Sequence, residues 1–135
     1  MTKGTSVKND PVSIINTWCR LGVGFLYIYH GLIPKIIWLS PIEVELVQLS
    51  GTGVSAKFIS PFAGLMEIVL GLTIIFYRKR IYPVYIAAIL LAALLLYTAY
   101  VMPSLLVGAF NPMSTNISGI ILCFIAIYSQ HHSRD

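Results

Sequence analysis

The chain has 135 residues; 57% are hydrophobic, 10% are charged, and the formal net charge is +4. Soluble domains typically carry about 25% charged residues, so this composition excludes an ordinary water-soluble protein and predicts one integral membrane domain. The basic residues are scattered at the ends of apolar runs and form no dense patch, so we expect no nucleic-acid partner.

The first membrane span is predicted over residues 12–36, after a polar tail at residues 1–11. Asp10 suits the helix cap and Pro11 suits the first helical turn. Pro34 is expected to kink or end the helix, because proline removes a backbone hydrogen bond from a helix interior.

A short helix, and not a second span, is predicted after this first run. Ser40, Pro41 and Glu43 have the spacing of a capping box, with serine as the cap and glutamate three residues later. Gly51 and Gly53 end the segment. We expect an amphipathic helix that lies on the membrane surface or covers the mouth of the bundle.

Three further spans are predicted over residues 58–77, 81–102 and 113–130, since about 20 apolar residues cross a bilayer. The segment SLLVGAF between the last two is too short to cross and is expected to be interfacial or re-entrant. The predicted fold class is therefore an all-α membrane protein, a four-transmembrane-helix bundle with a short interfacial helix after the first span. One membrane domain covers residues 12–130, and residues 131–135 form a tail.

The distribution of lysine and arginine predicts the orientation. With four spans, both termini and the turn at residues 78–80 lie on one side, and basic residues gather on the cytoplasmic side of membranes. That side holds seven basic residues and the other side holds two: Lys3, Lys8, Arg20, Arg78, Lys79, Arg80 and Arg134 against Lys35 and Lys57. We therefore place both termini in the cytoplasm and the protein in the cytoplasmic (inner or plasma) membrane.

Arg20 and Glu67 are charged residues inside predicted spans. A charge at the bilayer centre costs about 2.5 to 3.5 kcal/mol, so each needs a partner. At about 1.5 Å per residue, both lie roughly 12 to 15 Å from the cytoplasmic ends of their helices. We predict a buried Arg20–Glu67 ion pair, which either locks two helices together or takes a direct part in handling a proton or ligand.

A second group of polar residues falls in the outer third of the bundle. Its members carry hydroxyl, imidazole, ammonium or amide groups: Tyr27, His30, Lys35, Tyr97, Tyr100, Asn111 and Asn116. They are a candidate polar pocket for a quinone head group or a similar ligand. The alternative is ordinary interfacial placement, because tyrosine is common at membrane interfaces.

The two cysteines, Cys19 and Cys123, have no metal-ligand or C-x-x-C spacing, and we predict no metal site and no catalytic residue. They fall at similar depth, so a redox pair is one interpretation. The other is that both are small buried packing residues, as free cysteines usually are.

Three motifs are similar to those of the DoxX-like membrane proteins: HGLIPK at residues 30–35, GLMEIVLGL in the second span, and FNPMSTN at residues 110–116. With the arginine early in the first span, the resemblance covers nearly all of residues 18–128. It implies a four-helix membrane bundle. It also implies that the signature positions are Arg20, His30, Lys35, Glu67, Asn111, Pro112 and Asn116.

The resemblance further implies an accessory or quinone-adjacent membrane subunit of a redox system, with a soluble or membrane-bound redox partner and quinone as the candidate cofactor. The sequence shows no fused catalytic domain and no cofactor fingerprint, so a stand-alone enzyme is not expected. Two alternatives stay open: a small membrane transporter that uses Glu67, and a purely structural or assembly protein. The lipid bilayer is an expected partner in every case, and homo-oligomerisation is also open.

Overall fold

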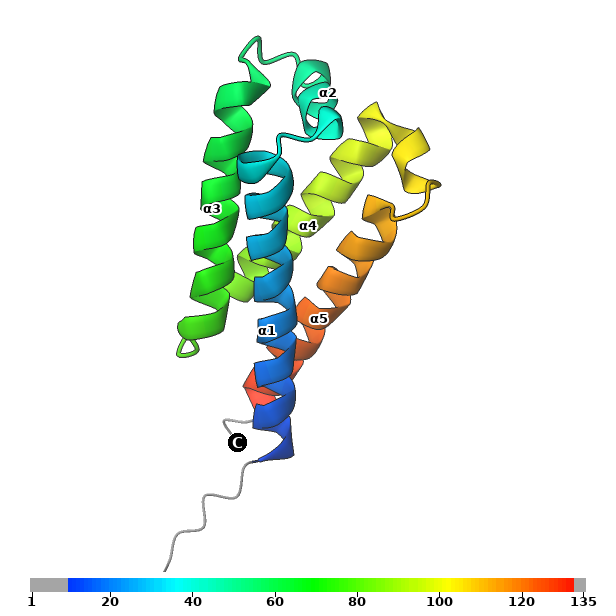
Figure 1. Ribbon diagram of the computed structural model, residues 1–135. Helices are drawn as coiled ribbons and strands as arrows, with labels where there is room; N and C mark the ends of the chain where they lie inside the picture. Colours follow the sequence, from blue (N-terminus) through cyan, green and yellow to red (C-terminus); the bar gives the residue numbers. More distant parts are fainter. Residues whose placement is uncertain (1–9, 133–135) are drawn as a thin grey trace, which may run out of the picture.

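The computed structural model describes residues 10–132, and within that range it contains helices and connecting turns but no strand. The four long helices are α1 (Pro11–Leu32), α3 (Ala56–Phe76), α4 (Tyr82–Val101) and α5 (Pro112–His132) (Figure 1). The tails expected at residues 1–11 and 131–135, with Lys3, Lys8 and Arg134, fall largely outside the described residues.

Three short elements connect the long helices at one end of the bundle. They are the π-helix η1 (Ile33–Ile37), the α-helix α2 (Pro41–Leu49) and the 3₁₀-helix η2 (Pro103–Leu106). α2 begins at Ser40, whose hydroxyl accepts a hydrogen bond from the Ile42 N–H.

The end of α1 shows what Pro34 does to the helix. The chain does not stop there but widens into the π-helical turn η1, which ends when the Trp38 N–H donates to the Ile33 carbonyl over 2.9 Å. π-Helical turns are rare and frequently mark functional sites. This one places Lys35 on the inner side of the bundle, where the side chain is buried.

Four glycines bring α1 and α3 into close backbone contact. A Cβ on Gly31 would lie 2.4 Å from the Gly64 carbonyl oxygen, and a Cβ on Gly24 would lie 2.9 Å from the Gly71 carbonyl oxygen. Small residues allow this approach in lipid, where packing and not hydrophobicity holds helices together. In Figure 1, α4 crosses the bundle obliquely, whereas α1 and α3 lie side by side in antiparallel directions.

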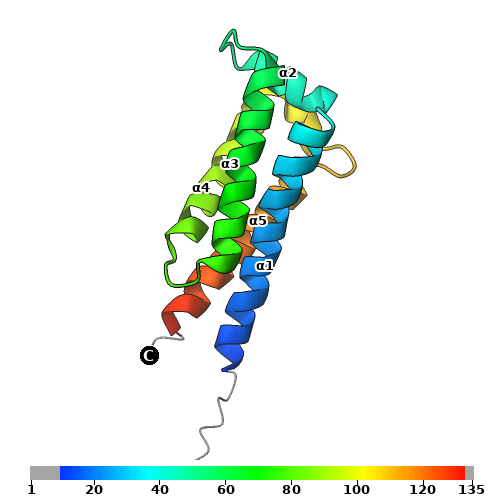
Figure 2. The ribbon, with the colours of Figure 1, turned by 60° about the vertical axis from the view of Figure 1, so that its left-hand side comes forward.

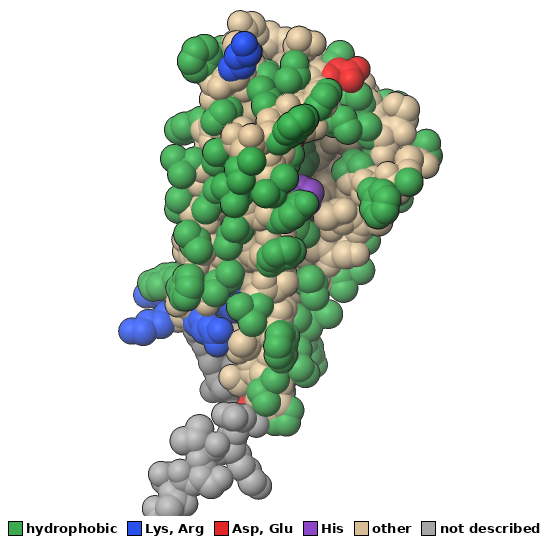
Figure 3. All heavy atoms as spheres, in the orientation of Figure 1, with side chains coloured by type: hydrophobic (Ala, Val, Ile, Leu, Met, Phe, Trp, Pro, Cys, Tyr) green, Lys and Arg blue, Asp and Glu red, His purple; other side chains and the backbone are tan. Residues whose placement is uncertain are grey.

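The buried core lies between the four long helices. Its side chains are mostly small or medium-sized, and both free cysteines belong to it: Cys19, Val23, Tyr27, Ile74, Val84, Ala87, Leu91, Cys123 and Ala126. Large apolar side chains instead cover the outside, as Figure 3 shows. An apolar exterior over an interior of small residues is the pattern of a protein that packs in lipid.

Three helices of the described chain, α3, α4 and α5, are each long and apolar enough to cross a membrane. The α1–η1 segment meets the same test only together with α2, from which it is bent by 91°. The chain is therefore an all-α integral membrane protein with three to four candidate spans.

The two ends of the bundle differ in composition. The start of α1, the turn at residues 78–80 and the end of α5 lie together, and we call this the basic end (Figures 1 and 2). The opposite end carries η1, α2 and η2, and we call it the α2 end. Lysine and arginine side chains gather at the basic end in Figure 3.

Candidate ligand pocket at the α2 end

Arg20 lies at the basic end and is fully buried, but its partners are not carboxylates. Its guanidinium donates to the carbonyl oxygens of Ile74 and Arg80, each over 3.1 Å, and to the side-chain oxygens of Asn16 and Gln130 over 3.0 and 3.2 Å. These bonds join α1 to the end of α3, the 78–80 turn and α5. A cation is also favourable beside the last carbonyls of a helix.

The predicted Arg20–Glu67 ion pair is therefore wrong. Arg20 is level with Ile74, which lies seven residues from Glu67, or about 10 Å along α3. Counting from helix ends failed because α1 extends past α3 at the basic end: Arg20 is nine residues from the start of α1, but Ile74 is two from the end of α3.

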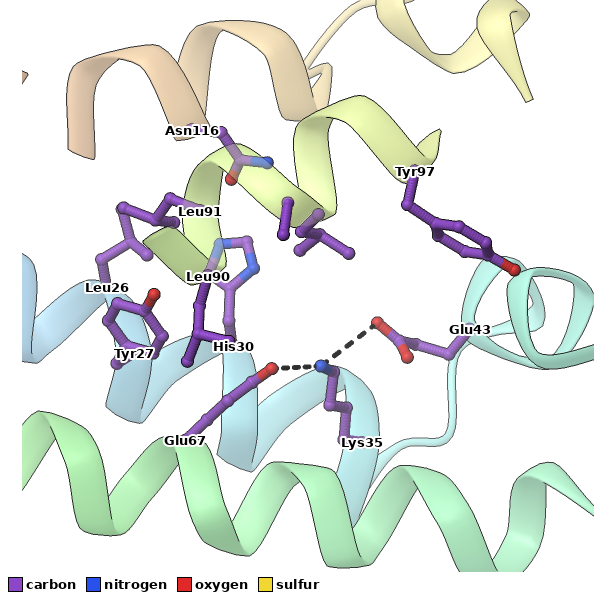
Figure 4. Close-up of a pocket in the computed structure, with 12 residues that line it drawn as sticks. Leu26, Tyr27, His30, Lys35, Glu43, Glu67, Leu90, Leu91, Tyr97 and Asn116 are labelled. Carbon is purple, nitrogen blue, oxygen red and sulfur yellow. Dashed lines mark hydrogen bonds and ion pairs between the residues drawn. The ribbon is translucent and has the colours of Figure 1, made fainter. Parts of the chain in front are cut away.

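Glu67 is paired instead with Lys35, at the α2 end. The Lys35 ammonium donates to Glu67 Oε1. On its other side, Lys35 Nζ lies 3.9 Å from Glu43 Oε1. Figure 4 shows Lys35 between these two carboxylates, which come from α3 and α2. We call Glu43, Lys35 and Glu67 the ionic triad.

The position of Glu43 departs from a complete capping box. In a complete capping box, the Ser40 N–H would donate a hydrogen bond to the Glu43 carboxylate. Here it donates instead to the Pro34 carbonyl oxygen over 2.9 Å. The Glu43 carboxylate is thus available to Lys35. Burial raises the pKa of the Glu43 carboxyl above its ordinary value, while the nearby Lys35 ammonium acts in the opposite direction.

The ionic triad forms one wall of a pocket of about 350 Å³. Four further polar residues, Tyr27, His30, Tyr97 and Asn116, line it together with leucines of α1 and α4 (Figure 4). Each of the five α-helices contributes at least one residue. Figure 3 shows a hollow in this half of the molecule, between apolar side chains.

Two atoms at the pocket are buried without a hydrogen-bond partner among the described residues. They are Nδ2 of Asn116, a side chain only 3% exposed, and Oε2 of Glu67. Buried polar atoms are almost always hydrogen-bonded, so an unpaired donor and an unpaired acceptor on one cavity require explanation. A ligand that accepts from the amide and donates to the carboxylate provides one.

The two tyrosine hydroxyls of the pocket already have partners. Tyr27 Oη donates to the Ala87 carbonyl oxygen and Tyr97 Oη donates to the Leu46 carbonyl oxygen, both over 2.7 Å. The second bond fastens α2 to α4. Both hydroxyls therefore donate within the fold, and the two rings form walls of the pocket.

A second hollow, of about 410 Å³, continues the pocket toward η2 and shares His30, Glu43, Leu94 and Asn116 with it. Asn111 lines this outer hollow, but its amide is engaged locally, donating to Gly108 and accepting from the Ser114 N–H. The inclusion of Tyr100 in the pocket is wrong, because this side chain is 87% exposed and lines neither hollow. Tyr100 follows Tyr97 by three residues on α4, and its side chain faces outward.

The structure therefore brings together five of the seven predicted pocket residues, and Asn111 lies in the adjoining hollow. Sequence reasoning missed Glu43, which was assigned only to a helix cap, and misplaced Glu67. The charges could have indicated a Lys35–Glu43 ion pair. Glu43 follows Lys35 by eight residues, across a Ser-Pro turn that can fold the chain back on itself. Within residues 10–132, no group of three or more His, Cys, Asp or Glu side chains could hold a metal ion.

Comparison with known proteins gives one match. The family model described as the DoxX-like family matches residues 24–124, about three quarters of the chain. Neither the curated proteins nor the solved structures contain a match to this sequence.

Proposed function

Because the chain belongs to the DoxX-like family, we propose that it is an accessory membrane subunit of a redox system whose pocket binds a quinone head group. The single observation that carries this proposal is the unpaired Asn116 amide, a buried hydrogen-bond donor that faces a cavity with leucine walls. Ligand sites are typically apolar hollows with a few polar groups that fix orientation, and this pocket has that composition.

The proposal includes a membrane placement. α1–η1, α3, α4 and α5 are the four spans, and α2 lies at the surface over the pocket. The basic end faces the cytoplasm, because Arg78, Lys79 and Arg80 lie there. The α2 end has only two basic residues within the described chain: Lys35, which lies between the carboxylates of Glu43 and Glu67, and Lys57. The pocket then opens toward the outer half of the bilayer.

The residues present fit a quinone. A quinone has two carbonyl oxygens that accept hydrogen bonds, and Asn116 Nδ2 is a free donor. The His30 ring faces the same space and can donate from one ring nitrogen (Figure 4). The reduced form carries hydroxyl groups, for which the unpaired Glu67 Oε2 is an acceptor, and Leu26, Leu90 and Leu91 provide flat apolar contact. When bound, the quinone would supply electron-carrying chemistry that these side chains lack.

The proposal is tested by titrating the purified protein, in native lipid, with a tail-less benzoquinone. Asn116→Leu removes the donor and should weaken binding about tenfold, equivalent to one hydrogen bond of about 1.4 kcal/mol. Tyr100→Phe lies outside the pocket and is the matched control that should bind as the wild type does. Equal affinity of wild type and Asn116→Leu, or no binding to the wild type, would reject the proposal.

One observation favours a second candidate, a proton-coupled transporter of a cationic substrate. Glu67 lines a pocket, and its partner is Lys35 and not an arginine, whose planar guanidinium would hold a carboxylate in a two-bonded pair. Proton-driven uptake into proteoliposomes that disappears in Glu67→Gln would support this function. Unchanged uptake in that variant would count against it.

A further inference from the structure

A groove between α3 and α4 leads away from the pocket. It has a volume of about 440 Å³ and an almost wholly apolar lining, formed by Met66, Val69, Leu70 and Thr73 of α3 and by Ile86 and Leu90 of α4. Its one hydroxyl, that of Thr73, already donates to the Val69 carbonyl oxygen over 2.7 Å. We call it the α3–α4 groove.

The groove and the pocket adjoin one another. Glu67 and Leu90 line both, so the carboxylate that pairs with Lys35 stands where the two hollows meet. Polarity changes sharply at that point: the ionic triad, His30 and Asn116 line the pocket, whereas the groove beyond Glu67 is lined by hydrocarbon and the bonded Thr73.

The groove is also open to the outside of the bundle. Met66, Val69 and Ile86 are each about half exposed, and they lie on helices apolar enough to be surrounded by lipid. A molecule in the groove would therefore have one side on protein and the other on acyl chains, with its polar end directed toward the triad.

We propose that the α3–α4 groove holds the hydrocarbon tail of an amphiphile whose head occupies the pocket, and that this ligand enters sideways from the bilayer. The inference rests on the proposed function and names its ligand class: a quinone with an isoprenoid or alkyl tail, not a water-soluble one. A water-soluble ligand would need only the pocket and the outer hollow near η2 and would leave the groove to ordinary lipid.

The test compares two quinones with the same dimethoxy-methyl-benzoquinone head, one without a tail and one with a ten-carbon alkyl tail. Ile86→Trp fills the groove from α4, and Met66→Trp fills it from α3; neither residue lines the pocket. Ile89→Trp is the matched control, because Ile89 is an exposed residue of α4 that does not line the groove. Affinities are measured in nanodiscs, per mole of lipid, so that membrane partitioning is the same for every variant.

We expect Ile86→Trp to weaken binding of the tailed quinone about tenfold, and to leave the tail-less quinone and the Ile89→Trp control within about twofold of wild type. If Ile86→Trp does not fold, Met66→Trp gives the same comparison. Unchanged binding of the tailed quinone in a folded groove variant would overturn the tail site while leaving the head site intact. Failure of both quinones to bind the wild type would overturn the head site and the tail site together.

Discussion

The two ends of this bundle treat buried charge in opposite ways. At the basic end, Arg20 has four hydrogen-bond acceptors, one each from α1, the end of α3, the 78–80 turn and α5. At the α2 end, one ammonium is shared by two carboxylates, and a buried amide nitrogen and a carboxylate oxygen have no hydrogen-bond partner within residues 10–132. Fully satisfied networks rigidify a fold, whereas a buried polar atom without a partner is an exception that a bound molecule can explain. The difference teaches that a charge inside a membrane protein is not by itself evidence of function.

Removing Arg20 should give the largest effect, because it breaks the satisfied network. Arg20→Leu leaves the Ile74 and Arg80 carbonyls without their bonds and should lower the free energy of unfolding by about 3 to 5 kcal/mol, because each buried acceptor left unpaired costs about 1 to 3 kcal/mol. Arg78→Leu is the control; Arg78 is exposed, and its loss should cost less than about 1 kcal/mol. Unfolding in mixed detergent measures both. A stable Arg20→Leu variant that has lost only ligand binding would contradict this assignment, because the basic end would then serve binding and not stability.

Separating α1 from α3 should have the next largest effect and should reach both ends. Gly31→Ala places a Cβ 2.4 Å from the Gly64 carbonyl oxygen, so the helices must move apart, at a cost of about 1 to 3 kcal/mol. The Lys35–Glu67 pair spans this contact and should weaken as well. Gly108→Ala, where a Cβ meets nothing within 4 Å, is the control for the substitution itself. Thermal unfolding and quinone affinity, measured together, should both change in Gly31→Ala.

Loss of the α2 fastening should have a smaller, local effect. Tyr97→Phe removes the bond to the Leu46 carbonyl oxygen and should cost about 0.5 to 1.5 kcal/mol, with faster amide exchange confined to α2. Tyr100→Phe should leave exchange unchanged. Faster exchange in α5 as well would mean that Tyr97 supports the whole bundle.

The pH dependence of α2 docking should show the smallest effect. Because burial raises the pKa of Glu43 in the folded protein, its contribution to stability is fully present below the ordinary value of 4.5 and declines as pH rises through the raised pKa. Amide exchange in α2, corrected for intrinsic rates, should therefore become faster as pH rises from the ordinary pKa of 4.5 through the raised pKa of Glu43. Glu43→Gln should abolish this dependence, and a wild type with no pH dependence would show that Glu43 does not titrate there.

The helical class and the helix positions followed from the sequence, because apolar runs of about 20 residues and proline and serine caps are local signals. The pairing of charges did not. Whether Glu67 pairs with Arg20 or Lys35 depends on the register of α1 against α3. Four glycines allow the observed register, but their positions in the sequence do not predict it. The π-helical turn at Lys35 also changes the direction in which this side chain points, and α-helical spacing does not predict that change.

The candidate pocket was predictable in part for the same reason. His30 and Tyr27 share a face of one helix, so their proximity is local, and Asn116 was expected at similar depth. Glu43 was read as a cap residue because the capping-box spacing is present, although its carboxylate turns inward. Tyr100 was included because depth alone cannot tell which face of a helix points outward.

We propose that this protein binds its ligand at the α2 end and not at the basic end. The decisive measurement is a structure of the protein extracted from its membrane into lipid nanodiscs with its native lipid. We expect ligand density in the pocket beside His30 and within hydrogen-bonding distance of Asn116 Nδ2. An empty pocket with ordered ligand density against Arg20 at the basic end would contradict it.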